Sequence, residues 1–276
     1  MTIVEFAKGH GTENDFVVLF DPDGRLDLTV EQVARIADQH RGLGADGVLR
    51  VVRSTLVPEA DKSAEWFMDY RNADGSIVEM CGNGVRVFAR YLQEQGLAST
   101  AGLDVSTRAG VKYTAFNSDG SITVDMGAPQ VLGESVTQVQ GKSVRGLGVS
   151  MGNPHLAIDL GLAGLRVAEL ELGTEPPYDR AFFADGVNQE FYQDAEPLEG
   201  SDLHVLMRVH ERGVGETRSC GTGVCAVAVA ALARDGQDAG VVVVDVPGGR
   251  LSTDVTPDRV LLTGPAVIVA RGQLSV

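Results

Sequence analysis

Cys81-Gly82-Asn83-Gly84-Val85 and Cys220-Gly221-Thr222-Gly223-Val224 are two versions of one motif, a cysteine followed by a glycine-rich turn. An apolar run of helical length follows each motif and ends near a glycine, Gly96 or Gly236. We therefore expect two helices that begin at a cysteine, where the N–H groups of the first turn favour an anion or a thiolate. One such cysteine is better explained as the cap of a buried helix, but the second copy favours a shared function.

The two motifs belong to a larger internal repeat. The cysteines are 139 positions apart, and the same offset superimposes Ala45-Asp46-Gly47-Val48 on Ala184-Asp185-Gly186-Val187 without gaps. It also pairs Gly9 with Gly148, Asn14 with Asn153, Met68 with Met207, Ala89 with Ala228, Gly110 with Gly249 and Asp119 with Asp258. Several separate matches in one register indicate that the chain is a duplicated unit.

Each copy is expected to place many short strands around one apolar helix. In the first copy, the predicted strands are 3–8, 15–20, 48–53, 66–71, 104–106, 111–116 and 121–126. The corresponding runs of the second copy are 147–159, 186–192, 203–210, 241–246, 251–255, 260–263 and 266–270. Thr29 with Gln32 predicts a capping box at a helix start, and 165–172 predicts a further helical stretch. The predicted fold class is α+β, with two pseudo-symmetric lobes, each a β-rich sheet or barrel around a central helix, and an active site in the cleft between them.

The composition indicates a soluble globular protein and opposes two classes of partner. Of 276 residues, 43% are hydrophobic, and the formal net charge of −15 opposes nucleic acid and anionic membranes as partners. The first residues lack a signal pattern, and no apolar run has the length of a membrane span. Three cysteines without secretory features favour a reducing, cytoplasmic location, and the absence of CxxC and HExxH gives a metal site little support.

Two thiols at helix N-termini, on opposite sides of one bound molecule, can invert a stereocentre. A thiolate removes a proton from one face of a carbon, and a thiol returns a proton to the other face. If that carbon carries a carboxylate, the N–H groups of the same helix N-termini stabilise the negative charge that develops on it. This chemistry needs no pyridoxal phosphate or other organic cofactor.

The two cysteine motifs and several further stretches together resemble the diaminopimelate epimerase family. The further stretches are Asn14-Asp15-Phe16, Asn72-Ala73-Asp74-Gly75, Gly152-Asn153-Pro154-His155, Glu211-Arg212-Gly213 and Gly215-Glu216-Thr217. The resemblance covers essentially the whole chain and implies interconversion of LL- and meso-diaminopimelate, without cofactor or metal, in lysine and peptidoglycan biosynthesis. It also implies a homodimer, a first lobe of residues 1–125 plus 265–276, and a second lobe of residues 126–264.

The resemblance implies a role for each matched position around the reacting carbon. Cys81 and Cys220 match the base and acid pair, whose roles exchange with the direction of the reaction, and Cys81 would face the α-proton of the LL isomer. The N–H groups that match the α-carboxylate site belong to Gly82, Asn83, Gly221 and Thr222.

The resemblance also implies a set of residues that grips the distal amino-acid end of the substrate. This set comprises Asn72, Asn153, Asn188 and Arg212, together with Glu211. Glu211 would bind an ammonium group and Arg212 a carboxylate. His155 and Glu211 are expected beside the thiols, and Asn14 is expected near the substrate.

Some positions depart from the family pattern or have simpler explanations. Many family members have a glutamine after Gly-Ala-Asp of the first repeat, whereas this chain has Gly47, so we leave that position out of the predicted site. His10-Gly11-Thr12-Glu13 fits the first turn of the family loosely. Cys225 is expected in the core, and Asp46 and Asp185 are expected to form turns rather than to take part in catalysis.

Other functions remain open at this point. Taken singly, Asn14 and Asn72 fit ordinary turns, Glu211 with Arg212 fits a solvated pair, and His155 fits a loop histidine. The proline racemase group shares the two-cysteine logic but usually has histidine at the position of Asn83 and lacks the Glu-Arg-Gly run. A thiol redox sensor would join the two cysteines on oxidation. A non-catalytic protein that binds a zwitterion would not need both thiols.

Overall fold

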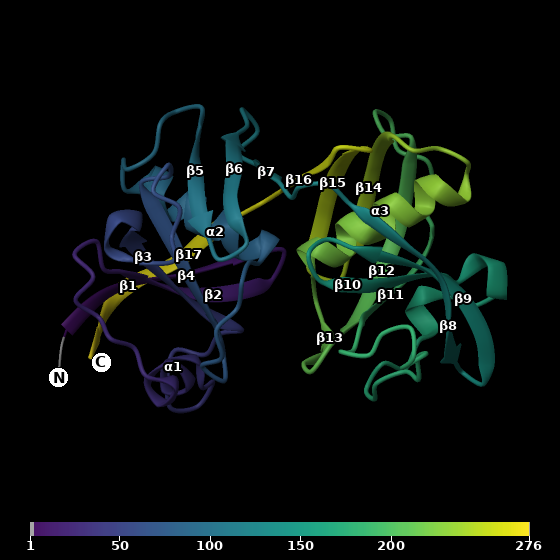
Figure 1. Cartoon of the computed structure of the whole chain (residues 1–276), viewed down its shortest axis with the longest axis horizontal. Helices are drawn as coiled ribbons and strands as arrows, with labels where there is room; N and C mark the ends of the chain where they lie inside the picture. Colours follow the sequence, from purple (N-terminus) through teal and green to yellow (C-terminus); the bar gives the residue numbers. More distant parts are fainter. Residues whose placement is uncertain (1–2, 276) are drawn as a thin grey trace. The chain divides into compact units, whose positions relative to one another are not determined.

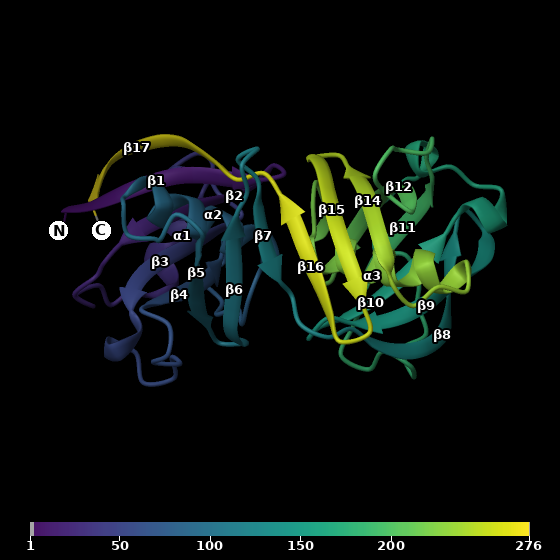
Figure 2. The same cartoon turned by 90° about the horizontal axis from the view of Figure 1, so that it is seen from above.

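The computed structural model describes residues 3–275, which form two compact units. Unit 1 extends to Val124 and resumes at Gly264, and unit 2 comprises Asp125–Thr263. Unit 1 is discontinuous because β17 (Val267–Ser275) pairs antiparallel with β1 (Ile3–Gly11), so that these two strands lie side by side (Figures 1 and 2).

The elements of unit 1 follow the predicted order closely. After β1 come β2 (Asn14–Phe20), α1 (Val30–Ala37), β3 (Gly47–Arg53), the 3₁₀ turn η1 (Ser54–Leu56), β4 (Trp66–Asn72), α2 (Gly82–Glu94), β5 (Gly102–Thr107), β6 (Gly110–Phe116) and β7 (Ile122–Asp125). The capping box at the start of α1 is confirmed. Thr29 Oγ1 accepts from the N–H of Gln32 at 3.2 Å, and Gln32 Oε1 accepts from the N–H of Thr29 at 2.9 Å.

Unit 2 repeats this plan. Its elements are β8 (Gln130–Val139), β9 (Lys142–Ser150), β10 (Pro154–Asp159), η2 (Gly161–Ala163), η3 (Val167–Glu169), β11 (Asn188–Asp194), β12 (Leu203–Glu211), β13 (Gly215–Thr217), α3 (Gly221–Arg234), β14 (Gly240–Val246), β15 (Gly249–Thr256) and β16 (Arg259–Gly264). The strand β8 was not predicted, because its inner positions include threonine and serine as well as valine. The helical prediction at 165–172 was wrong except for the short turn η3.

The strand pairings support the duplication. In unit 1, β1 pairs antiparallel with β2, β2 parallel with β3, β3 antiparallel with β4, β4 parallel with β5, and β5 antiparallel with β6. In unit 2, the series from β9 through β10, β11, β12 and β14 to β15 has the same alternation. The predicted fold class, a duplicated β-rich unit with one central helix, is therefore confirmed.

The two predicted helices form the centres of their units (Figure 1). The helix α2 contacts β1 to β6 and β17, and α3 contacts β9 to β12, β14 and β15. Almost every residue of α3 is buried, because its side chains after the first turn are apolar up to Arg234. In each case the N-cap residue is the predicted cysteine, Cys81 or Cys220. Among the helices of residues 3–275, none combines the length and apolar character that crossing a membrane would require.

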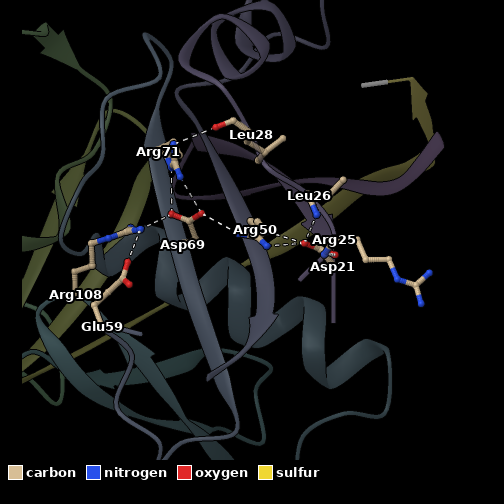
Figure 3. A network of polar contacts seen from close by, with 9 residues as sticks. All are labelled: Asp21, Arg25, Leu26, Leu28, Arg50, Glu59, Asp69, Arg71 and Arg108. Atoms are coloured by element: carbon tan, nitrogen blue, oxygen red, sulfur yellow. Dashed lines mark hydrogen bonds and ion pairs between the residues drawn. The ribbon is translucent and has the colours of Figure 1, made fainter. Parts of the chain in front are cut away.

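A buried ion-pair network joins β3, β4 and the turn after β5 in unit 1 (Figure 3). Asp69 accepts from Arg108 Nη2 at 2.7 Å and from Arg71 Nε at 3.2 Å, and its carboxylate lies 3.6 Å from Arg50 Nη1. Arg50 also pairs with Asp21 at 2.7 Å. Burial alone would raise the pKa of Asp69, but the hydrogen bonds from Arg71 and Arg108 outweigh it and hold that pKa below its usual value. The network therefore stabilises unit 1 only while Asp69 is ionised.

Candidate active site

The thiol of Cys81 has hydrogen-bond partners for both of its protonation states. Its Sγ accepts from the N–H of Gly84 at 3.4 Å, in the first turn of α2. The same sulfur donates to Asn14 Oδ1 at 3.7 Å. The N–H group and the helix N-terminus favour the thiolate, whereas the amide oxygen can bind only the thiol. Cys81 is half-buried, so it can exchange a proton with a bound molecule.

A chain of side chains holds Asn14 beside Cys81. Asn14 Nδ2 donates to Asp46 Oδ2 at 2.7 Å, and Asn14 Oδ1 accepts from Asn83 Nδ2 at 3.2 Å. Asn83 Oδ1 in turn accepts from Arg86 Nη2 at 2.7 Å. Each amide is thus bound through both its oxygen and its nitrogen, which fixes its orientation. The structure therefore brings three of the predicted residues together, Cys81, Asn14 and Asn83.

Two members of this chain of side chains, Asp46 and Arg86, were not among the predicted site residues. Asp46, which was expected to form a turn, lies in a bend just before β3, and its carboxylate accepts from the N–H of Asp15 at 3.0 Å and from Asn14 Nδ2 at 2.7 Å. Arg86 was not predicted at all, because a charged residue inside a helix is usually taken to face solvent. It is completely buried. Its position on the same helix face as Asn83, three residues earlier, was the available signal.

Asn72 lies at the end of β4, where a tight turn follows. Its side chain accepts from Tyr70 Oη at 3.0 Å and donates to Ser76 Oγ at 3.1 Å. Its N–H donates to the carbonyl of Ser76 at 2.9 Å, which closes the turn. The prediction that Asn72 belongs to a turn fits, but the side chain is held more firmly than a turn alone requires.

Cys220 lies in a more buried and more acidic setting than Cys81. Only 7% of the residue is exposed, and its Sγ lies 3.5 Å from Thr222 Oγ1. Burial, and then the carboxylates of Glu211 and Glu190, raise the pKa of Cys220 well above the usual value of a thiol. Cys220 is therefore a thiol at neutral pH.

A buried histidine and carboxylate lie close to Cys220. His155 Nδ1 is 2.7 Å from Glu190 Oε1, His155 Nε2 is 3.1 Å from Asn153 Oδ1, and neither His155 nor Glu190 is exposed. Within residues 3–275, Glu190 Oε2 is buried without a hydrogen-bond partner. A Cβ at Gly223 would lie 2.6 Å from Glu190 Oε1, so only glycine lets this carboxylate lie against the first turn of α3.

Glu190 was missed by the sequence analysis. A signal existed, because it is the one charged residue in the predicted run 186–192. Such a residue usually marks the solvent side of a strand, but every residue from Asn188 to Tyr192 is buried on β11. Glu190 thus joins the predicted residues His155, Asn153 and Cys220 in unit 2.

The remaining predicted residues of unit 2 lie at the ends of β11 and β12. Glu211 accepts from the hydroxyl of Thr217. Burial raises the pKa of Glu211, and the negative charge of Glu190 raises it further, while the hydrogen bond from Thr217 lowers it by less. Asn188 Oδ1 accepts from the N–H of Arg212 at 2.9 Å, and Arg212 Nη1 donates to the carbonyl of Asp185 at 2.9 Å. Asn188 therefore holds the segment that carries the exposed guanidinium of Arg212.

The residues predicted to bind a carboxylate through their N–H groups begin the two helices. Gly82 and Asn83 begin α2, and Gly221 and Thr222 begin α3. An N–H group in the first turn of a helix has no carbonyl partner earlier in that helix, which makes the turn suitable for an anion. Each unit thus offers a thiol, a helix N-terminus and a set of ordered polar side chains.

The sequence of this chain is similar to those of known proteins. The sequence profile of the family described as Diaminopimelate epimerase matches residues 6–132 and 148–269. Proteins named diaminopimelate epimerase from Rhodococcus opacus (strain B4) and Corynebacterium glutamicum (strain ATCC 13032) are 49% and 48% identical to this chain. These alignments cover 98% of this chain and 97% of the first relative, and 99% of both chains for the second.

Solved structures of more distant proteins share the fold. A PhzF-family phenazine biosynthesis protein from Bacillus anthracis has a TM-score of 0.70 at 18% identity, with 100% of both chains covered. A hydroxyproline epimerase from Agrobacterium vitis has a TM-score of 0.69 at 15% identity, covering 99% of this chain and 92% of the other. At these identities the likeness concerns the fold alone.

Proposed function

The chain belongs to the diaminopimelate epimerase family, and on this premise we propose that it interconverts LL- and meso-diaminopimelate by proton transfer between two cysteines. As a member of this family it is an epimerase that acts on a small molecule. The observation that carries the two-cysteine mechanism is that both thiols occupy the N-cap position of corresponding helices in the two repeats.

In the direction from the LL isomer, the Cys81 thiolate removes the α-proton and becomes a thiol. The electron pair of the broken C–H bond passes to the α-carbon and its carboxylate. The Cys220 thiol then gives its proton to the opposite face of that carbon and becomes a thiolate. The proposal requires both sulfurs to reach the same carbon, one from each side.

The surroundings of the two thiols support this assignment of roles. Cys81 has a donor for its thiolate, the N–H of Gly84, and an acceptor for the thiol that forms, Asn14 Oδ1. Cys220 has a raised pKa, so it begins as the acid. The buried carboxylates of Glu190 and Glu211 then destabilise the Cys220 thiolate, which favours its reprotonation. Proton transfer of this kind requires neither an organic cofactor nor a metal ion.

Substrate binding is assigned to the other predicted residues. The first turns of α2 and α3 bind the α-carboxylate, whose charge grows in the transition state. Asn72, Asn153, Arg212 and Glu211 bind the distal ammonium and carboxylate groups, and Asn188 contributes by holding Arg212. His155 is a positioning residue held by Glu190.

We also propose that the reaction serves lysine and peptidoglycan precursor synthesis in the cytoplasm and that the protein is a homodimer. The family provides the basis for these assignments. Light scattering coupled to size-exclusion chromatography tests the homodimer, since the chain mass is 29.1 kDa.

Proton NMR of LL-diaminopimelate in D₂O tests the proposed reaction. Reduced wild-type protein should remove the α-proton signal and produce the meso isomer, whereas folded Cys81→Ser and Cys220→Ser variants should do neither. Cys225→Ser is the matched control, because this buried cysteine lies within α3, and it should leave turnover unchanged.

Three other outcomes would replace the proposal. Turnover of proline in preference to diaminopimelate would indicate a proline racemase. Binding of diaminopimelate without exchange, unchanged in the serine variants, would indicate a binding protein. No exchange by folded, fully reduced protein, together with a reversible Cys81–Cys220 disulfide, would indicate a redox sensor.

A further inference from the structure

We propose that Tyr70 is a positioning residue that holds the side-chain amide of Asn72 in one orientation, and that Gly47 provides the space for its ring. The consequence for substrate rests on the proposed function, in which Asn72 binds the distal end of diaminopimelate. The hold of Tyr70 on Asn72 is a property of unit 1 and can be tested without any substrate.

The hydrogen bonds of Asn72 leave its side chain a single orientation. Tyr70 and Asn72 are two residues apart on β4, so their side chains lie on the same face of the strand. Tyr70 Oη donates to Asn72 Oδ1 at 3.0 Å, and Asn72 Nδ2 donates to Ser76 Oγ at 3.1 Å. Without the phenol donor, the amide could rotate and exchange the places of its oxygen and nitrogen, which have nearly the same shape.

The main chain around Asn72 is already held by the turn. The N–H of Asn72 donates to the carbonyl of Ser76, and the N–H of Gly75 donates to the carbonyl of Asn72, both at 2.9 Å. The side-chain torsions are therefore the freedom that remains to be restricted. Tyr70 restricts them, since this residue is itself only 7% exposed.

The ring of Tyr70 lies between Phe16 and Gly47. It meets Phe16 edge to face, with ring centroids 5.8 Å apart and an interplanar angle of 77°. Gly47 on β3 pairs directly with Asn72 on β4. A Cβ at position 47 would lie 2.6 Å from Tyr70 Cε2 and 2.7 Å from the carbonyl oxygen of Arg71, which is too close for any carbon atom.

A side chain at position 47 would therefore move the ring and draw the hydroxyl away from Asn72. The glycine and the tyrosine act as a pair, in which one makes room and the other uses the space to orient the amide. An oriented amide presents its remaining N–H and oxygen lone pair in defined directions. Asn72 can then distinguish a donor from an acceptor on its ligand.

Kinetics of three variants test the consequence for substrate. Tyr70→Phe keeps the ring and removes the donor, and Gly47→Ala displaces the ring. A lost neutral hydrogen bond is worth about 0.5–1.5 kcal/mol, so KM for LL-diaminopimelate should rise about 2- to 13-fold. Because the distal contact is the same in ground and transition states, kcat should stay within about twofold. Tyr113→Phe, on a tyrosine that is 58% exposed, should change neither constant.

The NMR signals of the side-chain amide of Asn72 test the orientation itself. In ¹⁵N-asparagine-labelled protein, assigned with an Asn72→Ser variant, these two proton signals should shift and exchange faster with solvent in Tyr70→Phe, while the other asparagine amides keep their positions.

Unchanged Asn72 signals in folded Tyr70→Phe would overturn the proposal, as would a loss of kcat without a change in KM. If Gly47→Ala does not fold, Tyr70→Phe still tests whether Tyr70 orients the side-chain amide of Asn72. If the wild-type protein does not turn over diaminopimelate, the proposed function fails, and the amide signals still show whether Tyr70 orients Asn72.

Discussion

Replacing Arg86 by methionine tests whether a buried guanidinium organises the residues around Cys81. Arg86 is completely buried on α2. It donates to Asn83 Oδ1 at 2.7 Å, to the carbonyl of Pro265 at 3.3 Å, and to Thr12 Oγ1 and the carbonyl of Gly82 at 3.4 Å. Methionine fills much of the same volume but provides no donor.

The expected effect follows from these four bonds. The short, charge-assisted bond to Asn83 is worth about 2 kcal/mol, and each of the long bonds about 0.5 kcal/mol. Removing a buried cation also removes its desolvation penalty, which offsets part of the loss. We therefore expect the free energy of unfolding of unit 1 to fall by about 3 kcal/mol, or a melting temperature lower by about 6–12 °C.

Fluorescence of Trp66 measures this change in urea, because the chain has a single tryptophan, and that residue is buried on β4 of unit 1. The matched control is Arg90→Met, one turn further along α2, where the arginine is only partly buried and donates to the carbonyl of Ala266 at 3.1 Å, to Gln93 Oε1 and to the carbonyl of Gly120. The free energy of unfolding of Arg90→Met should fall by about 1 kcal/mol or less.

The Arg86 variant should also lose turnover beyond its loss of stability, because Asn83 and Asn14 are no longer oriented beside Cys81. A stability change no larger than that of Arg90→Met would refute the reasoning. It would mean that the guanidinium contributes no net stabilisation and that the amides are held without it.

Two further predictions concern carboxylates. Glu190→Gln removes a negative charge beside Cys220, so the pKa of this thiol should fall and its thiolate absorbance should appear at lower pH. This shift must vanish when Cys220 is also replaced by serine. A shift to higher pH would contradict the assignment. Asp69 has a lowered pKa, so its ion pairs stabilise the fold above its unfolded value, about 3.9, and are lost as pH falls through the lower folded value. The free energy of unfolding of Asp69→Asn should therefore be about 3–5 kcal/mol lower than that of the wild type at neutral pH, and it should fall less steeply in acid. Urea unfolding across a range of pH measures both effects. If the variant loses stability in acid as steeply as the wild type, Asp69 is not the source of the acid sensitivity.

Local patterns in the sequence predicted most of the fold. The capping box at Thr29 and the two cysteine N-caps depend on residues close together in the chain, and the structure confirms them. The single 139-residue register predicted the duplication, because a repeat preserves the order of its elements. The stretch 165–172 misled because its apolar residues pack as loop and short turn against the core of unit 2.

The parts that the sequence analysis missed are charged groups whose partners are distant in sequence. Arg86 is stabilised by Pro265, and Glu190 by His155, across 179 and 35 residues respectively. A buried charge is compatible with an apolar helix or strand only when such partners are in place, and the local signals at Arg86 and Glu190 do not show which distant residues these partners are. In each unit, hydrogen bonds from neighbouring side chains hold predicted site residues in place.

The pairing of β1 with β17 has a consequence for how the protein forms on the ribosome. Ile3 and Ser275 are register partners, so the first strand of the chain must wait for one of the last to be synthesised. Unit 2, from Asp125 to Thr263, is continuous, and it is synthesised before β17. Joining ends so far apart in the chain carries a large entropic penalty, which is smaller once the intervening unit is compact. We therefore expect the second repeat to fold during translation, before β17 covers the exposed edge of β1.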